Sequence, residues 1–332
     1  MSLKIAIAGT GGVASHNYIP FLAEQSDVSL GYFNRTMEKA RAVAKSFPGE
    51  VFPSIEALAA WNPDSALVLT RETDRLEAGT ALIEAGVSKL FFEKPLVAAQ
   101  GQAHVSEDDF FNAKKMLDAA KARNCETAMV FNYRFFEQSL AAKKILAQRD
   151  FGEIINATVL SHYACWTHCI DLIYHFAGSV IEIVGLSGAR EIYSKVLDST
   201  ACDVAAALRM KNGASATLLG TAGLQWQHPL YELTLSFERG RIHLRDLDGA
   251  MEVLDGASQT HETYAFSRDN SRWDQYDASF KKSLAAYLDS LREGSTPPVP
   301  GIDGLRELQV EAALKRSIRE RRPVRVQEEF AL

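Results

Sequence analysis

Residues 5–14 of the chain are Ile-Ala-Ile-Ala-Gly-Thr-Gly-Gly-Val-Ala. The apolar run 5–8 predicts a buried strand, and the glycines after it predict a tight turn into a helix. Gly9, Gly11 and Ala14 have the G-x-G-x-x-A spacing of a dinucleotide-binding turn, in which the pyrophosphate lies on the N–H groups of the helix start. The alternative is an ordinary glycine turn. We expect cofactor contacts from Gly9, Thr10, Gly11, Gly12 and Val13.

The first half of the chain alternates apolar runs with helical patterns. Further strands are predicted at 28–33, 65–69, 89–92 and 127–131. Strands that are apolar throughout and separated by helices indicate a parallel sheet covered on both faces. The sequence therefore predicts an α/β, doubly wound Rossmann domain over residues 1–128. Pro20 should kink or restart the first helix.

After about residue 150 the pattern changes to strands joined by short turns. Asn212-Gly213 and Arg239-Gly240 are turn signals between strand pairs. This pattern predicts an α+β domain over residues 129–332 with a mostly antiparallel sheet. Its strands are expected at 154–163, 204–210, 214–219, 230–237 and 241–244, and its helices at 167–176, 273–293 and about 303–321.

Charge and composition exclude several classes of protein. The 36 Lys and Arg residues against 42 Asp and Glu give a net charge of -6, which argues against nucleic-acid binding. No apolar run approaches the ~18 residues needed to cross a bilayer. The N-terminal residues lack a signal-peptide pattern, and four cysteines in 332 residues do not suggest a disulfide framework. We expect a cytoplasmic protein with reduced thiols and no membrane partner.

The residues after the second strand bear on the choice of cofactor. NAD sites usually place a carboxylate there, whereas this chain has Asn34, Arg35 and Thr36. A guanidinium forms charge-assisted, bidentate hydrogen bonds with a 2′-phosphate. NADP is therefore favoured over NAD, although a surface arginine at a helix start is the plain alternative.

Four segments together resemble the glucose-fructose oxidoreductase / inositol dehydrogenase (Gfo/Idh/MocA) family. They are the glycine turn, Phe-Glu-Lys-Pro-Leu at 92–96, Phe-Asn-Tyr-Arg-Phe at 131–135, and the segment from Gly-Leu-Arg-Glu-Leu at 304–308 to Arg-Pro-Val at 322–324. The resemblance implies an N-terminal Rossmann domain and a C-terminal open-faced sheet. In relatives this sheet often carries the oligomer contact, so we expect a homodimer or homotetramer.

Lys94 is the first candidate catalytic residue. It follows Glu93 at the end of a predicted parallel strand, where cofactors bind in such sheets. An ammonium there can polarise a carbonyl or stabilise a forming alkoxide. The alternative is a lysine paired with a carboxylate. The resemblance assigns catalysis to this lysine and places Glu93 and Lys94 beside the cofactor.

His168 is the second candidate. The family carries D-x-G-x-H-x-x-D on a helix facing the nicotinamide, and His168 and Asp171 match its last two positions. Ala164 and Trp166 replace the first Asp and the Gly. Imidazole suits proton transfer near neutral pH, and Asp171, three residues on, could partly replace the missing carboxylate. A packed helix histidine is the alternative. We expect Asp171, His162 and Trp166 to line the substrate side.

Two further features of the sequence leave the details of the site undecided. The family's T-P-N-x-x-H pattern survives here only as Thr70, and Glu72 replaces an Asn that contacts the cofactor in relatives. The crowding of His162, Cys165, His168, Cys169 and His175 raises a zinc site as an alternative. Buried cysteine more often acts as a small hydrophobe, so we expect no metal.

The sequence thus predicts an NAD(P)-dependent oxidoreductase that transfers hydride to or from a sugar, polyol or related small molecule. Its rival is a non-catalytic dinucleotide-binding sensor of the same fold, which the resemblance permits and which Ala164 and the lost Thr-Pro-Asn pattern favour. A zinc-dependent enzyme is the third possibility.

Overall fold

A computed structural model describes the chain except for residues 1, 196, 225–228, 247–248 and 266–270. The chain forms two compact units: the first comprises Met1–Phe131 and Phe280–Leu308, and the second comprises Asn132–Ser279 and Gln309–Leu332. The division falls inside two helices, α8 (Arg272–Glu293) and α9 (Gly301–Glu320). The sequence analysis did not foresee that 280–308 would return to the first unit.

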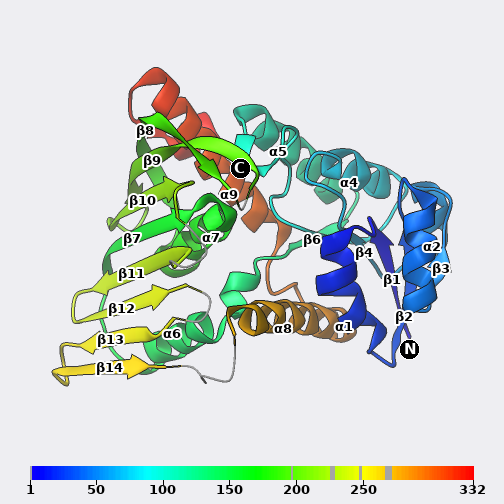
Figure 1. Cartoon of the computed structure of the whole chain (residues 1–332), viewed down its shortest axis with the longest axis horizontal. Coiled ribbons are helices and arrows are strands. Elements are labelled where there is room, and N and C mark those ends of the chain that lie inside the picture. The colour runs from blue at the N-terminus through cyan, green and yellow to red at the C-terminus, as the bar shows by residue number, and fades with distance from the viewer. Residues whose placement is uncertain (1, 196, 225–228, 247–248, 266–270) are drawn as a thin grey trace. The chain divides into compact units, whose positions relative to one another are not determined.

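The first unit is built on a parallel sheet (Figure 1). Among its described residues, six strands lie in the order β3-β2-β1-β4-β5-β6, and every neighbouring pair is parallel. The order reverses between β1 and β4, and in such sheets a ligand crevice opens at that point. The strands are β1 (Leu3–Ala8), β2 (Val28–Phe33), β3 (Glu50–Val51), β4 (Ser65–Val68), β5 (Lys89–Phe92) and β6 (Glu126–Met129).

Burial explains why these segments are strands. All four residues of β4 and the last four of β1 are buried, as expected when helices cover both faces of a sheet. The Rossmann architecture predicted from the sequence is confirmed. The helical elements are η1 (Ala14–Tyr18), α1 (Ile19–Ala23), α2 (Met37–Ser46), α3 (Ile55–Ala60), α4 (Arg75–Glu84), η2 (Gln102–His104) and α5 (Glu107–Ala122).

Pro20 interrupts the first helix as predicted. A π-helical turn, η1, ends at Tyr18, and α1 begins at Ile19 with Pro20 in its first turn. Proline is tolerated there because the first N–H groups of a helix have no partner within the helix.

The returning segment 280–308 is tied to the parallel sheet by side chains. The Tyr287 hydroxyl lies 2.7 Å from the Ser65 hydroxyl at the start of β4, and Arg292 forms an ion pair with Asp27. Phe280 packs edge-on against Tyr18, with ring centroids 5.3 Å apart. These contacts explain why most of α8, from Phe280 onward, belongs to the first unit.

The second unit contains a larger sheet. In its described part, nine strands lie in the order β14-β13-β12-β11-β7-β10-β9-β8-β15, and only the pair β7–β10 is parallel. The mostly antiparallel sheet is therefore confirmed. The strands are β7 (Ile154–His162), β8 (Val180–Ser194), β9 (Ser199–Met210), β10 (Ser215–Thr221), β11 (Tyr231–Phe237), β12 (Gly240–Arg245), β13 (Met251–Asp255), β14 (Thr260–Tyr264) and β15 (Val324–Arg325).

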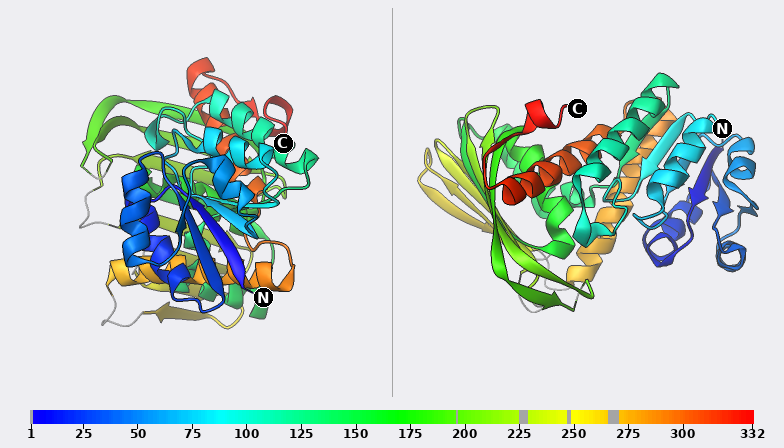
Figure 2. Two further views of the ribbon diagram at one scale, coloured as in Figure 1. Left: turned by 90° about the vertical axis from the view of Figure 1, so that its right-hand side faces the viewer. Right: turned by 90° about the horizontal axis from the view of Figure 1, so that it is seen from above.

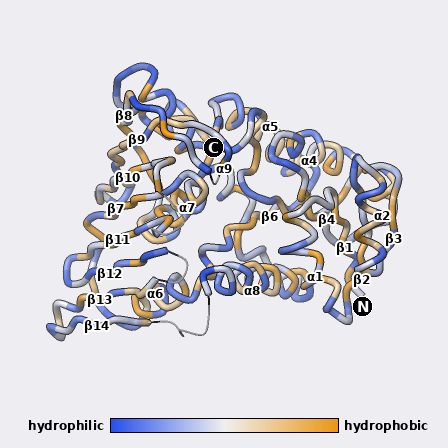
Figure 3. Tube along the Cα trace, in the orientation of Figure 1, coloured by the Kyte–Doolittle hydropathy of each residue, from blue (hydrophilic) through white to orange (hydrophobic). Residues whose placement is uncertain are grey.

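The described helices of this unit lie on one face of the sheet (Figure 2). They are η3 (Asn132–Phe135), α6 (Glu137–Gln148), η4 (Tyr163–Cys165), α7 (Trp166–Ala177), α10 (Val326–Glu329) and the unit's parts of α8 and α9. Along β10, buried and exposed residues alternate, and the strands of this sheet carry both hydrophobic and hydrophilic stretches (Figure 3). This period of two is typical of a sheet with one packed face and one open face.

The sequence analysis missed strands β8, β13 and β14, and also the two-residue strands β3 and β15. Residues 186–191 of β8 are all exposed and include Gly188 and Arg190, so they carry little of the apolar signal that marks a buried strand.

No helix of the described residues has the length and apolar character that a membrane span requires.

Candidate cofactor and active site

The glycine turn closes tightly onto the neighbouring strand. Gly9 has φ +101°, and a Cβ there would lie 2.6 Å from the backbone N of Thr70. Its N–H donates to the carbonyl of Phe33 at the end of β2. Only glycine fits this position, because both the backbone angle and the space exclude a side chain.

The rest of the turn leaves room for a dinucleotide. A Cβ added at Gly11 or Gly12 would meet nothing within 4 Å. The hydroxyl oxygens of Thr10 and Thr70 are buried and have no hydrogen-bond partner among the described residues. Buried hydroxyls are normally paired, so two of them beside an open glycine backbone fit a ligand that supplies the missing partners. The residues present therefore fit a nicotinamide dinucleotide, and Thr10, Gly11, Gly12 and Thr70 are candidates to bind it.

Asn34 braces the turn from the end of β2. Its Oδ1 accepts from the Thr10 N–H at 3.1 Å, and its Nδ2 donates to the Thr36 carbonyl at 3.0 Å. The Arg35 side chain is 84% exposed and lies 3.7 Å from Asp74. A surface pair of this kind is weak, so the guanidinium can turn toward a ligand.

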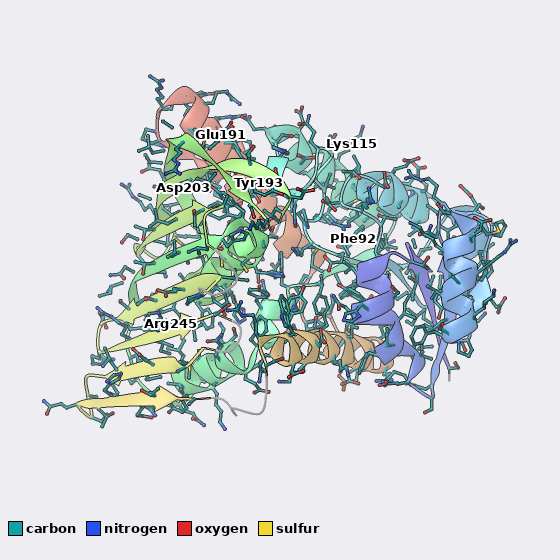
Figure 4. The ribbon with its side chains drawn as sticks, in the orientation of Figure 1. Phe92, Lys115, Glu191, Tyr193, Asp203 and Arg245 are labelled. Carbon is teal, nitrogen blue, oxygen red and sulfur yellow. The ribbon has the colours of Figure 1, made fainter. Side chains whose placement is uncertain are left out.

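Lys94 directly follows Glu93 beyond Phe92, the last residue of β5 (Figure 4). The peptide bond from Lys94 to Pro95 is cis. Lys94 Nζ donates to Gln102 Oε1 at 3.3 Å. Because the amide is neutral, this contact does not cancel the charge of the ammonium.

Glu93 and Arg75 are buried, and both adjoin the Lys94–Pro95 segment: Glu93 precedes Lys94 in the chain and Arg75 contacts the Pro95 carbonyl. Glu93 accepts a hydrogen bond from the Tyr18 hydroxyl at 3.0 Å. Arg75 donates to the Thr70 carbonyl at 2.9 Å and also to the Pro95 carbonyl. Burial lowers the pKa of Arg75, and the nearby Glu93 and Glu72 oppose that shift. Arg75, which the sequence analysis missed, therefore joins the backbone after β4 to the backbone after β5.

His168 lies in the second unit, on α7, and is 2% exposed. The Tyr133 ring stacks on the imidazole, with centroids 3.9 Å apart and an interplanar angle of 8°. The Tyr133 hydroxyl lies 3.1 Å from Cys165 Sγ, and burial raises the pKa of Tyr133 well above its usual range. The phenol therefore stays neutral and fixes the plane of the imidazole.

Asp171 forms a bidentate ion pair with Arg134. The guanidinium donates through Nε to Oδ2 at 2.8 Å and through Nη2 to Oδ1 at 2.5 Å. The Asp171 side chain is 1% exposed and that of Arg134 is 13% exposed. A buried bidentate pair fixes both groups. Arg134 was quoted in the family motif but not chosen as a site residue.

His162 and Trp166 have places in the packing of the second unit. His162 is fully buried; its Nδ1 accepts from the Ala164 N–H at 3.0 Å, and its Nε2 lies 3.1 Å from the Ser194 hydroxyl. Trp166 covers Gly220 on β10, where a Cβ would lie 2.5 Å from the indole. Both residues thus pack within the second unit, and the expectation that they line the substrate side stays a prediction.

The structure groups the candidates by unit. The first unit brings the glycine turn, Asn34, Thr70, Glu93 and Lys94 to the carboxyl ends of β1, β2, β4 and β5. The second unit brings His168 and Asp171 together on α7 with Tyr133 and Arg134 of η3. In the described residues, no group of three or more His, Cys, Asp or Glu is arranged to hold a metal ion.

A family model matches the N-terminal part of the chain. Residues 3–131 match the family described as an oxidoreductase family with an NAD-binding Rossmann fold, Gfo/Idh/MocA. The match confirms the resemblance over these residues and, at the level of that family, the expectation of an oxidoreductase with a domain that binds a nicotinamide dinucleotide.

Solved structures share the fold over the whole chain. An oxidoreductase from Agrobacterium radiobacter in complex with NAD+, L-tartaric acid and magnesium matches with a TM-score of 0.82 at 15% identity, covering 99% of this chain and 100% of that one. The WlbA dehydrogenase from Bordetella pertussis, in complex with NADH and UDP-GlcNAcA, matches at 0.74 and 18%, covering 98% and 99%. A putative myo-inositol dehydrogenase from Sinorhizobium meliloti matches at 0.75 and 16%, covering 98% and 100%.

Proposed function

We propose that this protein is an NAD(P)-dependent oxidoreductase that acts on a hydroxyl or carbonyl carbon of a sugar, polyol or related small molecule. One observation carries the proposal: Lys94, just beyond the carboxyl end of β5, is hydrogen-bonded to a neutral amide. An ammonium held in this way keeps its charge for a reacting oxygen. The similar proteins named above include one putative myo-inositol dehydrogenase and one dehydrogenase solved with a nucleotide sugar, which supports small hydroxylated substrates.

The chemistry of each side chain suggests its role in the reaction. A nicotinamide held at the glycine turn would accept or supply the hydride. Lys94 binds the substrate oxygen. During oxidation Lys94 stabilises the alkoxide charge left when the hydroxyl proton departs, and during reduction it stabilises the charge that the carbonyl oxygen gains as hydride adds to its carbon. His168 takes the hydroxyl proton during oxidation and returns it during reduction, a task suited to imidazole. Tyr133 stacks on His168 and so limits the orientations of the imidazole.

The same proposal favours NADP over NAD. Arg35 is exposed just after β2, where a 2′-phosphate would lie, and its partner Asp74 is 3.7 Å away. Asn34 brings no negative charge to this position and instead braces the Thr10 N–H. A carboxylate that would select the free ribose hydroxyl is therefore replaced by neutral and cationic side chains.

A non-catalytic sensor of NAD(P) is the second candidate, and one observation favours it. Ala164 stands where relatives place the carboxylate that works with the histidine, and Asp171 is held by Arg134. On that view the first unit would bind cofactor while the second reports its presence.

A hydride-transfer screen separates the two candidates. Purified protein is mixed with NADP or NAD and a panel of sugars, polyols and their keto forms, and the absorbance of the reduced nicotinamide is followed in both directions. The enzyme proposal expects turnover with at least one compound and its loss in Lys94→Met. Cofactor binding without turnover, together with a Lys94→Met variant that responds to every ligand as the parent does, would instead support the sensor.

We further propose that the open face of the large sheet joins two copies of the chain into a homodimer or higher homo-oligomer. Val184 is 43% exposed, Leu186 71% and Leu219 48%, on strands whose charged neighbours Arg209 and Glu182 already pair with each other. A second copy would cover these apolar side chains. Light scattering should give a mass of at least two chains, and Leu186→Lys should shift it toward one; a parent protein of one chain's mass would refute this.

A further inference from the structure

A segment after β5 supplies the amide that contacts Lys94. Residues 98–105 lie between the segment that carries Lys94 and the start of α5 at Glu107. They include the short helical turn η2 (Gln102–His104). Gly101 within it has φ +89°, a conformation that glycine adopts at little cost. We call residues 98–105 the Gln102 loop.

Two carboxylates anchor the Gln102 loop. Glu72 Oε1 accepts from the backbone N–H of Gln102 at 3.3 Å, and the Glu72 carbonyl accepts from the N–H of Ala98 at 3.3 Å. Asp109, which is 1% exposed, accepts from the N–H of Ala99 at 2.8 Å. The loop is therefore fixed near its start and near its tip by hydrogen bonds to charged acceptors, which are stronger than neutral ones.

The anchored loop presents the Gln102 side chain to Lys94. Gln102 Oε1 accepts from Lys94 Nζ at 3.3 Å, and both residues are partly buried. Lys94, Gln102 and Glu72 thus form a continuous chain of contacts within the first unit. Glu72 stands at the position where the family resemblance expects an asparagine that touches the cofactor, and in this chain its carboxylate holds the loop.

We propose that Gln102 is a positioning residue for Lys94, delivered by a loop that Glu72 anchors. The inference rests on the proposed function, because it assigns Gln102 the task of orienting the ammonium toward the reacting oxygen. A flexible lysine side chain has many rotamers, and a fixed acceptor reduces that freedom before substrate binds. A neutral acceptor does this without forming an ion pair, so the cation remains available to the substrate oxygen.

The test compares Gln102→Ala and Gln102→Glu with Gln100→Ala, an exposed residue of the same loop that serves as the control. The first readout needs no turnover: the labelling rate of Lys94 by an amine-acylating reagent at fixed pH, measured by mass spectrometry against other lysines of the same chain. Losing the acceptor should speed the labelling, because only the neutral amine reacts. A carboxylate in its place should slow the labelling, because it favours the ammonium.

The second readout is kinetic. Gln102→Ala should lower kcat by about tenfold, the size expected for one charge-assisted hydrogen bond, while the Kd for NADPH stays within about twofold. Glu72→Ala should act like Gln102→Ala, whereas Glu72→Gln, which retains an acceptor oxygen, should retain most of the activity. A loop that is merely structural would move the labelling rate in the same direction in Gln102→Ala and Gln102→Glu.

The outcomes separate this inference from the proposed function. Opposite labelling shifts in the two Gln102 variants, with Gln100→Ala unchanged, support the inference. Equal or absent shifts overturn it, even if Lys94→Met abolishes turnover. A Lys94→Met variant with the parent's turnover overturns the role of Lys94 in the proposed function, whatever the labelling shows.

Discussion

Asp171 binds Arg134 through both of its carboxylate oxygens, although its spacing from His168 suggested a different partner. The i+3 relationship on α7 places Asp171 near His168, and the sequence analysis expected it to stand in for the missing carboxylate. The structure instead pairs it with a guanidinium from η3, immediately after Tyr133. Tyr133 and Arg134 thus secure His168 and Asp171 respectively.

A substitution that breaks the Asp171–Arg134 pair should lower the stability of the protein. Asp171→Asn removes the bidentate carboxylate from the guanidinium of Arg134, which is 13% exposed. We expect a loss of ~3 kcal/mol in the free energy of unfolding, because the remaining charge stays largely desolvated. Urea denaturation measures this change. Asp150→Asn, at an 87% exposed carboxylate that also pairs with an arginine, is the matched control and should change stability by less than ~1 kcal/mol. Equal losses of unfolding free energy in the two variants would contradict a larger contribution from the buried pair.

The glycine turn offers a test in which two similar substitutions act differently. Gly9→Ala should destabilise the first unit by ~2 kcal/mol or more, because φ is +101° and the new Cβ would lie 2.6 Å from Thr70 N. Gly12→Ala meets nothing within 4 Å, so it should leave the melting temperature nearly unchanged but weaken NADPH binding by roughly tenfold. Calorimetric unfolding and cofactor titration measure both. A Gly12→Ala variant with unchanged cofactor affinity would place the dinucleotide elsewhere.

Arg35 should decide between the two cofactors. Arg35→Ala should weaken NADPH binding by roughly tenfold or more, because it removes a charge-assisted contact with the 2′-phosphate, and should change NADH binding by less than about twofold. Fluorescence titration of the reduced cofactors gives both constants. Arg41→Ala, an exposed arginine on α2, is the control. Equal losses for NADPH and NADH in Arg35→Ala would contradict the assignment of NADP.

The stability of the second unit should depend on pH through His175. Burial, with the charges of Lys143 and Arg134, lowers the pKa of His175 from 6.5 to about 3. Between these values the unfolded chain binds a proton that the folded chain does not, so stability is full above about pH 6.5 and falls as the pH drops toward 3.

His175→Gln should therefore flatten part of the stability curve between pH 7 and pH 4. Urea unfolding of the variant and the parent at several pH values measures the difference. His162, whose pKa burial also lowers, remains in the variant, so some dependence should persist. The exposed His261→Gln serves as the control. A difference between His175→Gln and the parent that does not change with pH would contradict the shift.

Local patterns predicted most of the fold. The buried run in β1, the turn at Asn212-Gly213 and the restart at Pro20 each depend on residues close together in the chain, and each was found. The path of 280–308 was not predictable in this way. An amphipathic helix shows that it has an apolar face, but not that Tyr287 will meet Ser65, which is 222 residues away.

The same distinction, between features set by short motifs and contacts set by packing, applies to the candidate site. The glycine turn and Lys94 were found because their chemistry lies in short motifs at strand ends. Arg134 and Asp171 are 37 residues apart, and their pairing depends on how η3 packs on α7. Gln102 was missed because its loop matches no motif, and only the anchors at Glu72 and Asp109 show where its side chain lies.

The account depends on one claim, that the Lys94 ammonium contacts the reacting oxygen of the substrate. A crystal structure of the protein with NADPH and an unreactive analogue of a substrate found in the screen tests it most directly. We predict that Lys94 Nζ lies ~3 Å from the analogue oxygen that corresponds to the reacting hydroxyl or carbonyl. A complex in which this oxygen does not contact Lys94 would contradict the claim.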